Sequence, residues 1–241
     1  MVLTDGEVEM AEKKAPKNQG RETKGSRHHL QNFVNETPDL LNSLIVSASP
    51  SLLAANVSII QWKSPLKGST PDRPYFEYRD DFLQPLGLPE HEKALREFWP
   101  KNGPQWDALA TMKVTGKKGC LLVEAKAYPD ESKTATKASS AASILAIEKS
   151  LSITQGHMGV SPSDWKTGHY QLGNRLAFLY FMNEVIHVPT WLVLINFVND
   201  TTHHPTDLST WIETYREVFT SMGIKPDSPL MSRIIILFPP V

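Results

Sequence analysis

The sequence predicts an α/β fold, with a mixed β-sheet core flanked by helices on both faces, in a single domain over residues 31–241. Two observations predict it. A hairpin of two strands occupies the middle of the chain, and two continuous apolar runs of strand length follow, each preceded by a helical segment. A hairpin pairs antiparallel and helix-separated strands pair parallel, so together they give a mixed sheet.

The composition is that of an ordinary globular chain. Its 241 residues are 40% hydrophobic, and 25 Lys and Arg against 26 Asp and Glu give a formal net charge of −1. This balance gives no long-range attraction to nucleic acid, so any such contact must depend on a local basic patch or a bound metal ion. The one cysteine, Cys120, lies in an apolar strand and is expected in the core. Because we find neither a signal-type segment nor about 18 consecutive apolar residues, we expect a cytoplasmic protein without a membrane partner.

The first part of the chain predicts an arm and then short helices. Residues 1–30 offer almost no apolar side chain to bury, so a mobile polar arm is expected. Ordered structure is expected from about Thr37, which can cap a helix that opens with proline. Residues 56–62 predict a strand. Residues 74–87 and 89–99 predict helices, each opened by proline.

A hairpin and five later elements complete the predicted fold. The hairpin strands are expected at residues 105–114 and 120–128, around a glycine-containing turn. Two helices, a buried strand, an amphipathic helix and a final apolar strand then follow. These later elements are expected at residues 136–153, 161–185, 190–198, 206–223 and 233–239.

Two carboxylates and a lysine are predicted to meet on the hairpin. A turn centred near Gly116 and Lys117 sets Asp107 opposite Lys126, with Glu124 one pair away. Successive side chains alternate between faces, so Glu124 and Lys126 share one face. Carboxylates among apolar neighbours repel each other, and a hard divalent cation such as Mg²⁺ relieves that repulsion, while a lysine can orient or activate water. A cross-strand ion pair on a solvated sheet face is the alternative.

An Asp in one strand, followed after sixteen residues by Glu-x-Lys in the next, resembles the PD-(D/E)XK nuclease superfamily, which has the restriction-endonuclease-like fold. Asp107 and the triplet Glu124–Ala125–Lys126 carry the match. The expected order of helices and strands over residues 55–220 also resembles the α-β-β-β-α-β order of that fold. More narrowly, the stretches EYRDDFLQPLGLPE, EFWPKNGPQWDALA and LLVEAKA resemble a group of uncharacterised bacterial proteins on this fold, to which no substrate is assigned.

The resemblance implies a nuclease that hydrolyses nucleic-acid phosphodiester bonds with Mg²⁺ or Mn²⁺, and DNA is the expected substrate. It implies Asp107 and Glu124 as metal ligands and Lys126 as the residue that positions or activates water. Glu77, on the expected helix at residues 74–87, would be a further ligand, with a solvated helix face as the alternative. Many nucleases of this fold act as dimers, so a homodimer is also considered.

The sequence departs from the superfamily pattern at two places. Trp106, and not proline, precedes Asp107. Gln171 is followed at four residues by Arg175, where some exonuclease members carry tyrosine. Residues one helical turn apart can face the same site, so Gln171 is a candidate catalytic residue and Arg175 a candidate phosphate ligand. A hydrogen bond on the helix surface is the alternative for this pair.

Lysines just after the hairpin provide the local basic patch that the net charge does not. Lys133 and Lys137 are candidates for contact with a phosphate backbone, with a solvated helix start as the alternative. At the level of the whole chain, two rivals to the nuclease are kept. One is a non-enzymatic binding module whose polar face is structural, and the other is a different metal-dependent hydrolase with the same residues.

Overall fold

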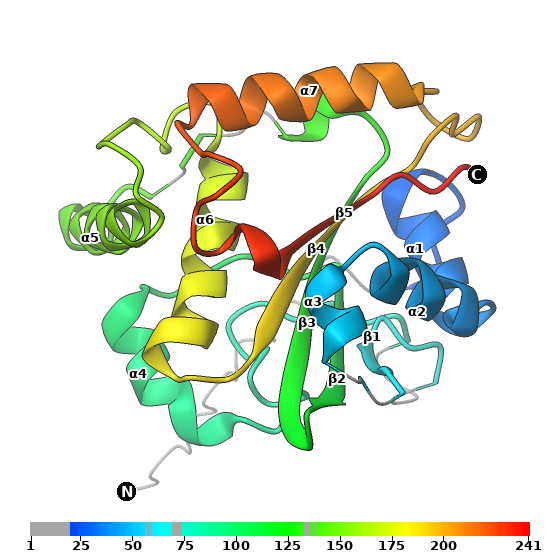
Figure 1. The fold of residues 1–241 in the computed structure, drawn as a ribbon, viewed down its shortest axis with the longest axis horizontal. Coiled ribbons are helices and arrows are strands. Elements are labelled where there is room, and N and C mark those ends of the chain that lie inside the picture. Colours follow the sequence, from blue (N-terminus) through cyan, green and yellow to red (C-terminus); the bar gives the residue numbers. More distant parts are fainter. Residues whose placement is uncertain (1–19, 56, 58, 69–73, 133–134, 137) are drawn as a thin grey trace, which may run out of the picture.

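The computed structural model describes residues 20–241, except residues 56, 58, 69–73, 133–134 and 137. The described residues form an α/β protein with one five-stranded mixed sheet and seven α-helices (Figure 1). The strands are β1 (Gln61–Ser64), β2 (Ala108–Val114), β3 (Lys117–Lys126), β4 (Thr190–Asn196) and β5 (Ile234–Leu237). The helices are α1 (Gly25–Asn35), α2 (Pro38–Ser47), α3 (Pro50–Ala54), α4 (Glu92–Phe98), α5 (Ala141–His157), α6 (Tyr170–Tyr180) and α7 (Leu208–Ser221).

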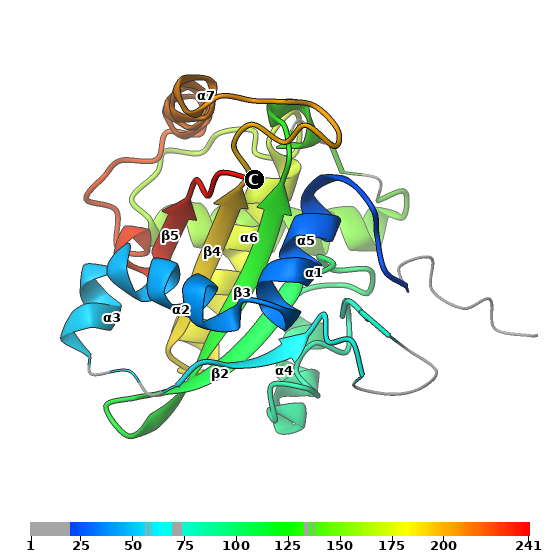
Figure 2. The same cartoon turned by 90° about the vertical axis from the view of Figure 1, so that its right-hand side faces the viewer.

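The sheet joins an antiparallel half to a parallel half. Its strand order is β1-β2-β3-β4-β5, in which β2 pairs antiparallel with both β1 and β3. The strands β3, β4 and β5 are parallel and point the same way in Figure 2. Because β2 runs against β3, the beginning of β2 and the carboxyl end of β3 lie at the same edge of the sheet. This topology brings Asp107, directly before β2, close to Glu124 and Lys126.

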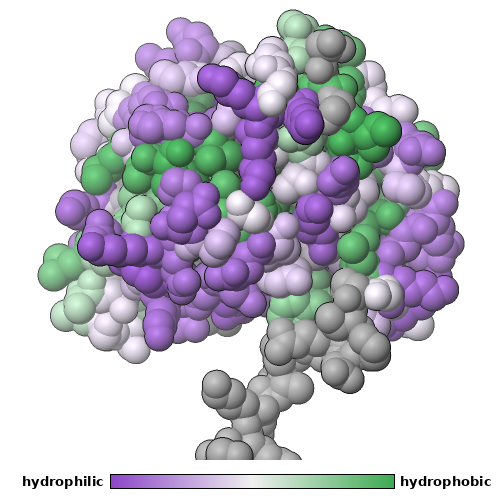
Figure 3. Space-filling model, turned by 90° about the horizontal axis from the view of Figure 1, so that it is seen from below, coloured by the Kyte–Doolittle hydropathy of each residue, from purple (hydrophilic) through white to green (hydrophobic). Residues whose placement is uncertain are grey.

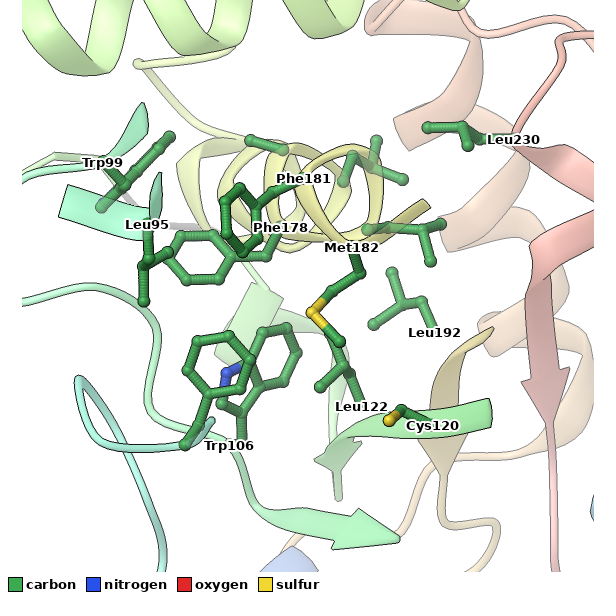
Figure 4. Close-up of a cluster of buried hydrophobic side chains, with 14 of the residues drawn as sticks. Leu95, Trp99, Trp106, Cys120, Leu122, Phe178, Phe181, Met182, Leu192 and Leu230 are labelled. Carbon is green, nitrogen blue, oxygen red and sulfur yellow. The ribbon is translucent and has the colours of Figure 1, made fainter. Parts of the chain in front are cut away.

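Helices cover both faces of the sheet, as the pattern of strands and helices predicts (Figures 1 and 2). The helices α1, α2 and α3 pack on one face, whose core includes Leu121 and Val123 of β3. On the other face, Leu122 packs with Phe178 and Phe181 at the end of α6 (Figure 4). Alternate residues of β3 thus enter two separate cores, because neighbouring strand side chains point to opposite faces.

Cys120 belongs to the core on the α6 side, as expected. Its side chain is fully buried, and burial raises the pKa of its thiol to about 12. A thiol with such a pKa carries almost no thiolate at neutral pH, so Cys120 has the properties of a small apolar core residue.

The hairpin has a tighter turn than predicted. Val114 pairs with Lys117, so the two-residue turn is Thr115–Gly116, and both turn residues have positive φ, at 50° and 79°. This backbone matches the twist of two-residue hairpins. The partner of each β2 residue therefore lies two residues earlier in β3 than predicted, and the continued register sets Asp107 opposite Glu124 in place of Lys126.

The expected helix at residues 74–87 is wrong. This segment consists of turns and an isolated bridge between Tyr78 and Trp106. Two features oppose the helix. Pro85 lacks the N–H that a helix interior needs. The carboxylate of Asp80 accepts hydrogen bonds from the backbone N–H groups of Asn102, at 2.9 Å, and Gly103, at 3.1 Å, so it fixes a loop instead.

The two long helices after the hairpin begin later than predicted. Ser140 caps α5 by accepting a hydrogen bond from the Ser143 N–H, so this helix begins at Ala141 and not near residue 136. The segment before α6 is irregular, because the Asp164 carboxylate binds the N–H groups of Lys166 and Thr167 in a local turn. The other expected helices and strands after residue 88 are confirmed to within a few residues.

The expected arm overlaps a helix. Ordered structure was expected from about Thr37, but α1 spans Gly25–Asn35, and its Leu30 and Val34 are buried against the sheet. The boundary drawn at residue 30 thus falls inside α1, and residues 1–19 lie outside the described part.

The face of the molecule seen from below is largely hydrophilic, with hydrophobic residues in separate patches (Figure 3).

Candidate active site

Asp107, Glu124 and Lys126 lie on the same side of the sheet, at the carboxyl end of β3. The Ala125 side chain enters the core on the opposite face, which confirms the predicted alternation along β3. The backbone N–H of Ala125 donates a hydrogen bond of 2.8 Å to Oδ2 of Asp107, so the hairpin itself fixes this carboxylate. Glu124 is 5% exposed and is the most enclosed of the three side chains.

Glu124 accepts hydrogen bonds on both of its carboxylate oxygens. Lys126 Nζ, at 2.5 Å, and Gln171 Nε2, at 2.8 Å, both donate to Oε1. Arg175 donates to Oε2 twice, from Nε at 2.7 Å and from Nη2 at 2.5 Å. A carboxylate offers about four acceptor positions, so these four bonds use all of them. The four-residue spacing of Gln171 and Arg175 on α6 brings both to the predicted site, where they bind Glu124.

Arg175 is itself held on several sides. Its Nη1 donates to Asn174 Oδ1 and its Nη2 to the backbone oxygen of Gln105, both at 2.8 Å. Its guanidinium carbon lies 4.9 Å from the ring centroid of Trp106, within the range of a cation–π contact. Trp106 therefore supports the arginine that neutralises Glu124.

Glu77 forms a second buried ion pair beside the first. Arg27 Nε donates to Oε1 at 2.6 Å, and Gln105 Nε2 donates to Oε2 at 2.5 Å. The bridge between Tyr78 and Trp106, and not a helix, brings Glu77 to this edge of the sheet. Arg27 and Gln105 were not predicted as site residues. Gln105 lies two residues before Asp107, but Arg27 is 50 residues from Glu77, so no local pattern indicates that pair.

Burial and charge shift the pKa values of the three carboxyl groups in different directions. Burial, followed by the charges of Glu124 and Glu77, raises the pKa of Asp107 well above its usual value. Burial also raises the pKa of Glu77, and Arg27 only partly opposes this. Burial by itself also raises the pKa of Glu124, but the charges and hydrogen bonds of Arg175 and Lys126 outweigh burial, so the pKa of Glu124 is lowered. Of the three groups, Glu124 is therefore the one whose ionised form the site favours, and Asp107 is the one whose ionised form it disfavours most strongly.

A cleft of about 620 Å³ adjoins this cluster. Its lining includes the cationic side chains of Arg79, Lys101 and Arg175, and none of its described lining residues is acidic. The serine-rich amino end of α5 forms part of its wall. This composition favours anionic ligands, because the cations attract them and the hydroxyl groups can donate hydrogen bonds.

A much smaller cavity, of about 30 Å³, lies against Glu124 and Lys126. Its volume suits one or two water molecules. Gln171 and Arg175 border both this cavity and the cleft. The two side chains of α6 therefore stand between the cleft and the carboxylate of Glu124.

The donor chemistry of Asp107 and Glu124 fits a hard divalent cation, which commonly uses one or two carboxylates together with water and phosphate oxygens. The charges of Glu124 and Glu77 both raise the pKa of Asp107, and a divalent cation bound beside Asp107 would relieve this repulsion. A cation could bind Glu124 only if at least one of its four hydrogen bonds were broken, because these bonds occupy its acceptor positions. Within the described ranges, no group of three or more His, Cys, Asp or Glu side chains is placed to hold a metal ion.

The structure brings together most of the predicted site. The residues that converge are Glu77, Asp107, Glu124, Lys126, Gln171 and Arg175. Lys133 and Lys137 lie outside the described residues. Arg79 and Lys101 were not predicted, since single basic residues in irregular segments carry no recognisable pattern.

No protein-family model matches the chain, and no curated protein and no solved structure is significantly similar to it. Among the residues that the structure describes, no helix has the length and apolar character needed to cross a membrane.

Proposed function

We propose that this protein is a Mg²⁺- or Mn²⁺-dependent nuclease of the restriction-endonuclease-like fold, which hydrolyses phosphodiester bonds in nucleic acid, with DNA as the expected substrate. The observation that carries the proposal is the meeting of Asp107, Glu124 and Lys126 on one side of the sheet, beside a basic cleft. The order of elements supports it, since helices, the three strands β1, β2 and β3, two helices and the strand β4 follow one another in the α-β-β-β-α-β order of that fold, with α4 inserted between β1 and β2.

The residues of the site have distinct roles in this proposal. Asp107 and Glu124 would hold the cation, which when bound stabilises negative charge on phosphate oxygens and lowers the pKa of water. Glu77 is held by Arg27 and Gln105 and supports the site from outside that pair. Lys126 borders the small cavity beside Glu124, where its ammonium group can orient a water molecule. Gln171 positions Glu124 through a hydrogen bond. Arg175 would bind a phosphate group of the nucleic acid that lies in the cleft.

Cleavage assays test this function directly. Supercoiled plasmid, single-stranded DNA and RNA are each incubated with Mg²⁺ or Mn²⁺ and the purified protein, with EDTA as the metal-free arm. We expect cleavage that EDTA abolishes and that falls by about 100-fold or more in Glu124→Gln and in Lys126→Met. Glu213→Gln, at an exposed ion pair on α7, is the matched control and should cleave as wild type does. Cleavage that survives in both site variants would refute the assignment.

A non-enzymatic binding module is the second candidate, and one observation favours it. The three carboxylates of the site are matched by three cations, and Glu124 is already saturated with hydrogen bonds. The cations are Arg27, Lys126 and Arg175. Such a site is stable without metal and leaves the basic cleft to bind an anionic polymer. Metal-independent binding of nucleic acid without cleavage in any arm of the assay would favour this candidate.

A further inference from the structure

Arg175 occupies the position where a cation would bind Glu124. Its Nε and Nη2 atoms together take the whole of Oε2, whereas Lys126 and Gln171 share Oε1. Withdrawal of Arg175 alone would therefore free one complete carboxylate oxygen. Lys126 could stay in place, since it binds the other oxygen.

Arg175 is buried, but a ligand in the cleft could contact it. Arg175 borders the cleft as well as the small cavity beside Glu124. It uses four of its five N–H donors, one on Nε, one on Nη1 and two on Nη2. A phosphate in the cleft can accept bonds from the guanidinium group in the paired geometry that a carboxylate offers, so the arginine can exchange one partner for the other.

The loop on one side of the cleft is firmly held. Asp80 accepts hydrogen bonds from the backbone of Asn102 and Gly103, and Arg96 binds Asp80 in turn at 3.2 Å. Lys101, which lines the cleft, lies directly before these anchored residues. The backbone beside Lys101 is therefore anchored, and the cleft presents the positive charges of Lys101 and Arg79 to an anion before any rearrangement at Glu124.

We propose that Arg175 is a gate between the cleft and Glu124. When a phosphate group of the nucleic acid binds in the cleft, it draws the guanidinium group of Arg175 away from Glu124. The Glu124 carboxylate then becomes available to a divalent cation. Without the phosphate, a buried Glu124 that lost Arg175 would lack part of its charge compensation, which is costly, so the gate stays closed. This inference rests on the proposed function and adds to it that phosphate and metal bind cooperatively through one residue.

Metal binding, and not cleavage, tests the gate. The free Mn²⁺ signal in electron paramagnetic resonance gives the Mn²⁺ affinity of the protein, alone and with a short phosphorothioate DNA oligonucleotide. Titrations of the oligonucleotide without protein provide the background. For wild type we expect the oligonucleotide to tighten Mn²⁺ binding by about tenfold or more, and Mn²⁺ to tighten oligonucleotide binding by the same factor. The same oligonucleotide with uncharged methylphosphonate linkages should have no effect.

The variant Arg175→Met separates the gate from direct contact between metal and phosphate. It should bind Mn²⁺ without oligonucleotide about tenfold more tightly than wild type, and it should lose most of the coupling. Arg175→Lys keeps the charge but not the paired geometry, so its Mn²⁺ affinity should lie in between; this second variant keeps the test valid if the first does not fold. Lys101→Met, at an exposed lysine of the cleft, is the matched control. It should weaken oligonucleotide binding and leave the Mn²⁺ affinity of the protein alone unchanged.

The outcomes distinguish the gate from the function on which it rests. If the Arg175 variants bind Mn²⁺ no more tightly than wild type while wild type cleaves DNA, the gate is wrong and the nuclease proposal stands. If neither wild type nor any variant binds Mn²⁺ in either condition, both proposals fail. Glu124→Gln should abolish site-specific Mn²⁺ binding in every arm, and Mn²⁺ binding that it leaves intact would also refute the gate.

Discussion

Two buried carboxylates, Glu124 and Asp200, have their negative charge compensated in different ways. Glu124, at the carboxyl end of β3, is compensated by the long side chains of Lys126, Gln171 and Arg175. Asp200, shortly after β4, is compensated locally by Thr202 and by His29 of α1, whose Nε2 lies 2.9 Å from Oδ1. A buried carboxylate is costly unless donors surround it. Donors meet both oxygens of Glu124, whereas the described contacts of Asp200 are all made to Oδ1.

The two carboxylates differ in the kind of group that donates hydrogen bonds to them. Long, flexible side chains can reach a second partner, and Arg175 borders the cleft in which we propose that a phosphate binds. The donors to Asp200 are a backbone N–H, a short hydroxyl and an imidazole, and Thr202 also accepts a hydrogen bond of 3.0 Å from the N–H of Gly25 at the start of α1. The Asp200 cluster thus fastens α1 to the loop after β4, whereas the proposed gate requires the Glu124 cluster to rearrange. Substitutions that disturb each cluster should separate these two roles.

The largest effect on stability is expected at Glu124. Glu124→Ala leaves the buried guanidinium group of Arg175 without its partner and should lower the free energy of unfolding by about 3–5 kcal/mol. Urea denaturation at neutral pH measures this change. The double variant Glu124→Met with Arg175→Met removes both charges and should lose less than the single variant. Glu213→Ala, on the exposed face of α7, is the control and should change the free energy of unfolding by less than about 1 kcal/mol. Equal losses in the single and double variants would show that the ion pair is not the source of the effect.

The sequence predicts the parts of the site that depend on local periodicity. Alternation along a strand places Glu124 and Lys126 together, and helical spacing places Gln171 and Arg175 together, because both periods are fixed by backbone geometry. The exact hairpin register could not be predicted, since it depends on Thr115 adopting positive φ, which is unusual for a β-branched residue.

Contacts between distant segments could not be predicted either. Arg27 was assigned to a mobile arm because few apolar residues surround it, yet α1 buries Leu30 and Val34 and so brings Arg27 to Glu77. The segment of Glu77 was predicted as a helix, but Asp80 accepts hydrogen bonds from the backbone of a loop more than twenty residues away, and these bonds fix the segment in another conformation. Such non-local bonds leave no periodic signal in the sequence, and neither does the basic cleft that they help to form.

A smaller effect, with a distinct dependence on pH, is expected at Asp200. Burial raises the pKa of Asp200, but hydrogen bonds from Thr202 and His29 outweigh it and leave the pKa below its usual value. A lowered folded-state pKa stabilises the fold above the unfolded-state value of about 3.9, and this stabilisation is lost as the pH falls through the folded-state value. Asp200→Asn should therefore cost about 1–3 kcal/mol at neutral pH and progressively less below about pH 4.

Urea denaturation at several pH values between 7 and 3 tests this dependence. The difference in unfolding free energy between wild type and Asp200→Asn should shrink as the pH falls. Asp227→Asn, in an exposed turn, is the matched control and should show a small difference at every pH. A difference for Asp200→Asn that stayed constant over the whole range would mean that its charge does not stabilise the fold.

The smallest effect is expected from Thr202→Val, which keeps the shape of the side chain and removes its hydroxyl group. The variant loses the hydrogen bond to Asp200 and leaves the N–H of Gly25 without its acceptor, so the free energy of unfolding should fall by about 1 kcal/mol. Thr201→Val, at the exposed neighbouring residue, controls for the change in polarity. Because Thr202 fastens α1 and lies outside the Glu124 cluster, Mn²⁺ and oligonucleotide affinities should match those of wild type. A change in Mn²⁺ affinity as large as that of Arg175→Met would show that the two clusters are coupled, and that α1, through Arg27 and Glu77, helps to set the charge balance at Glu124.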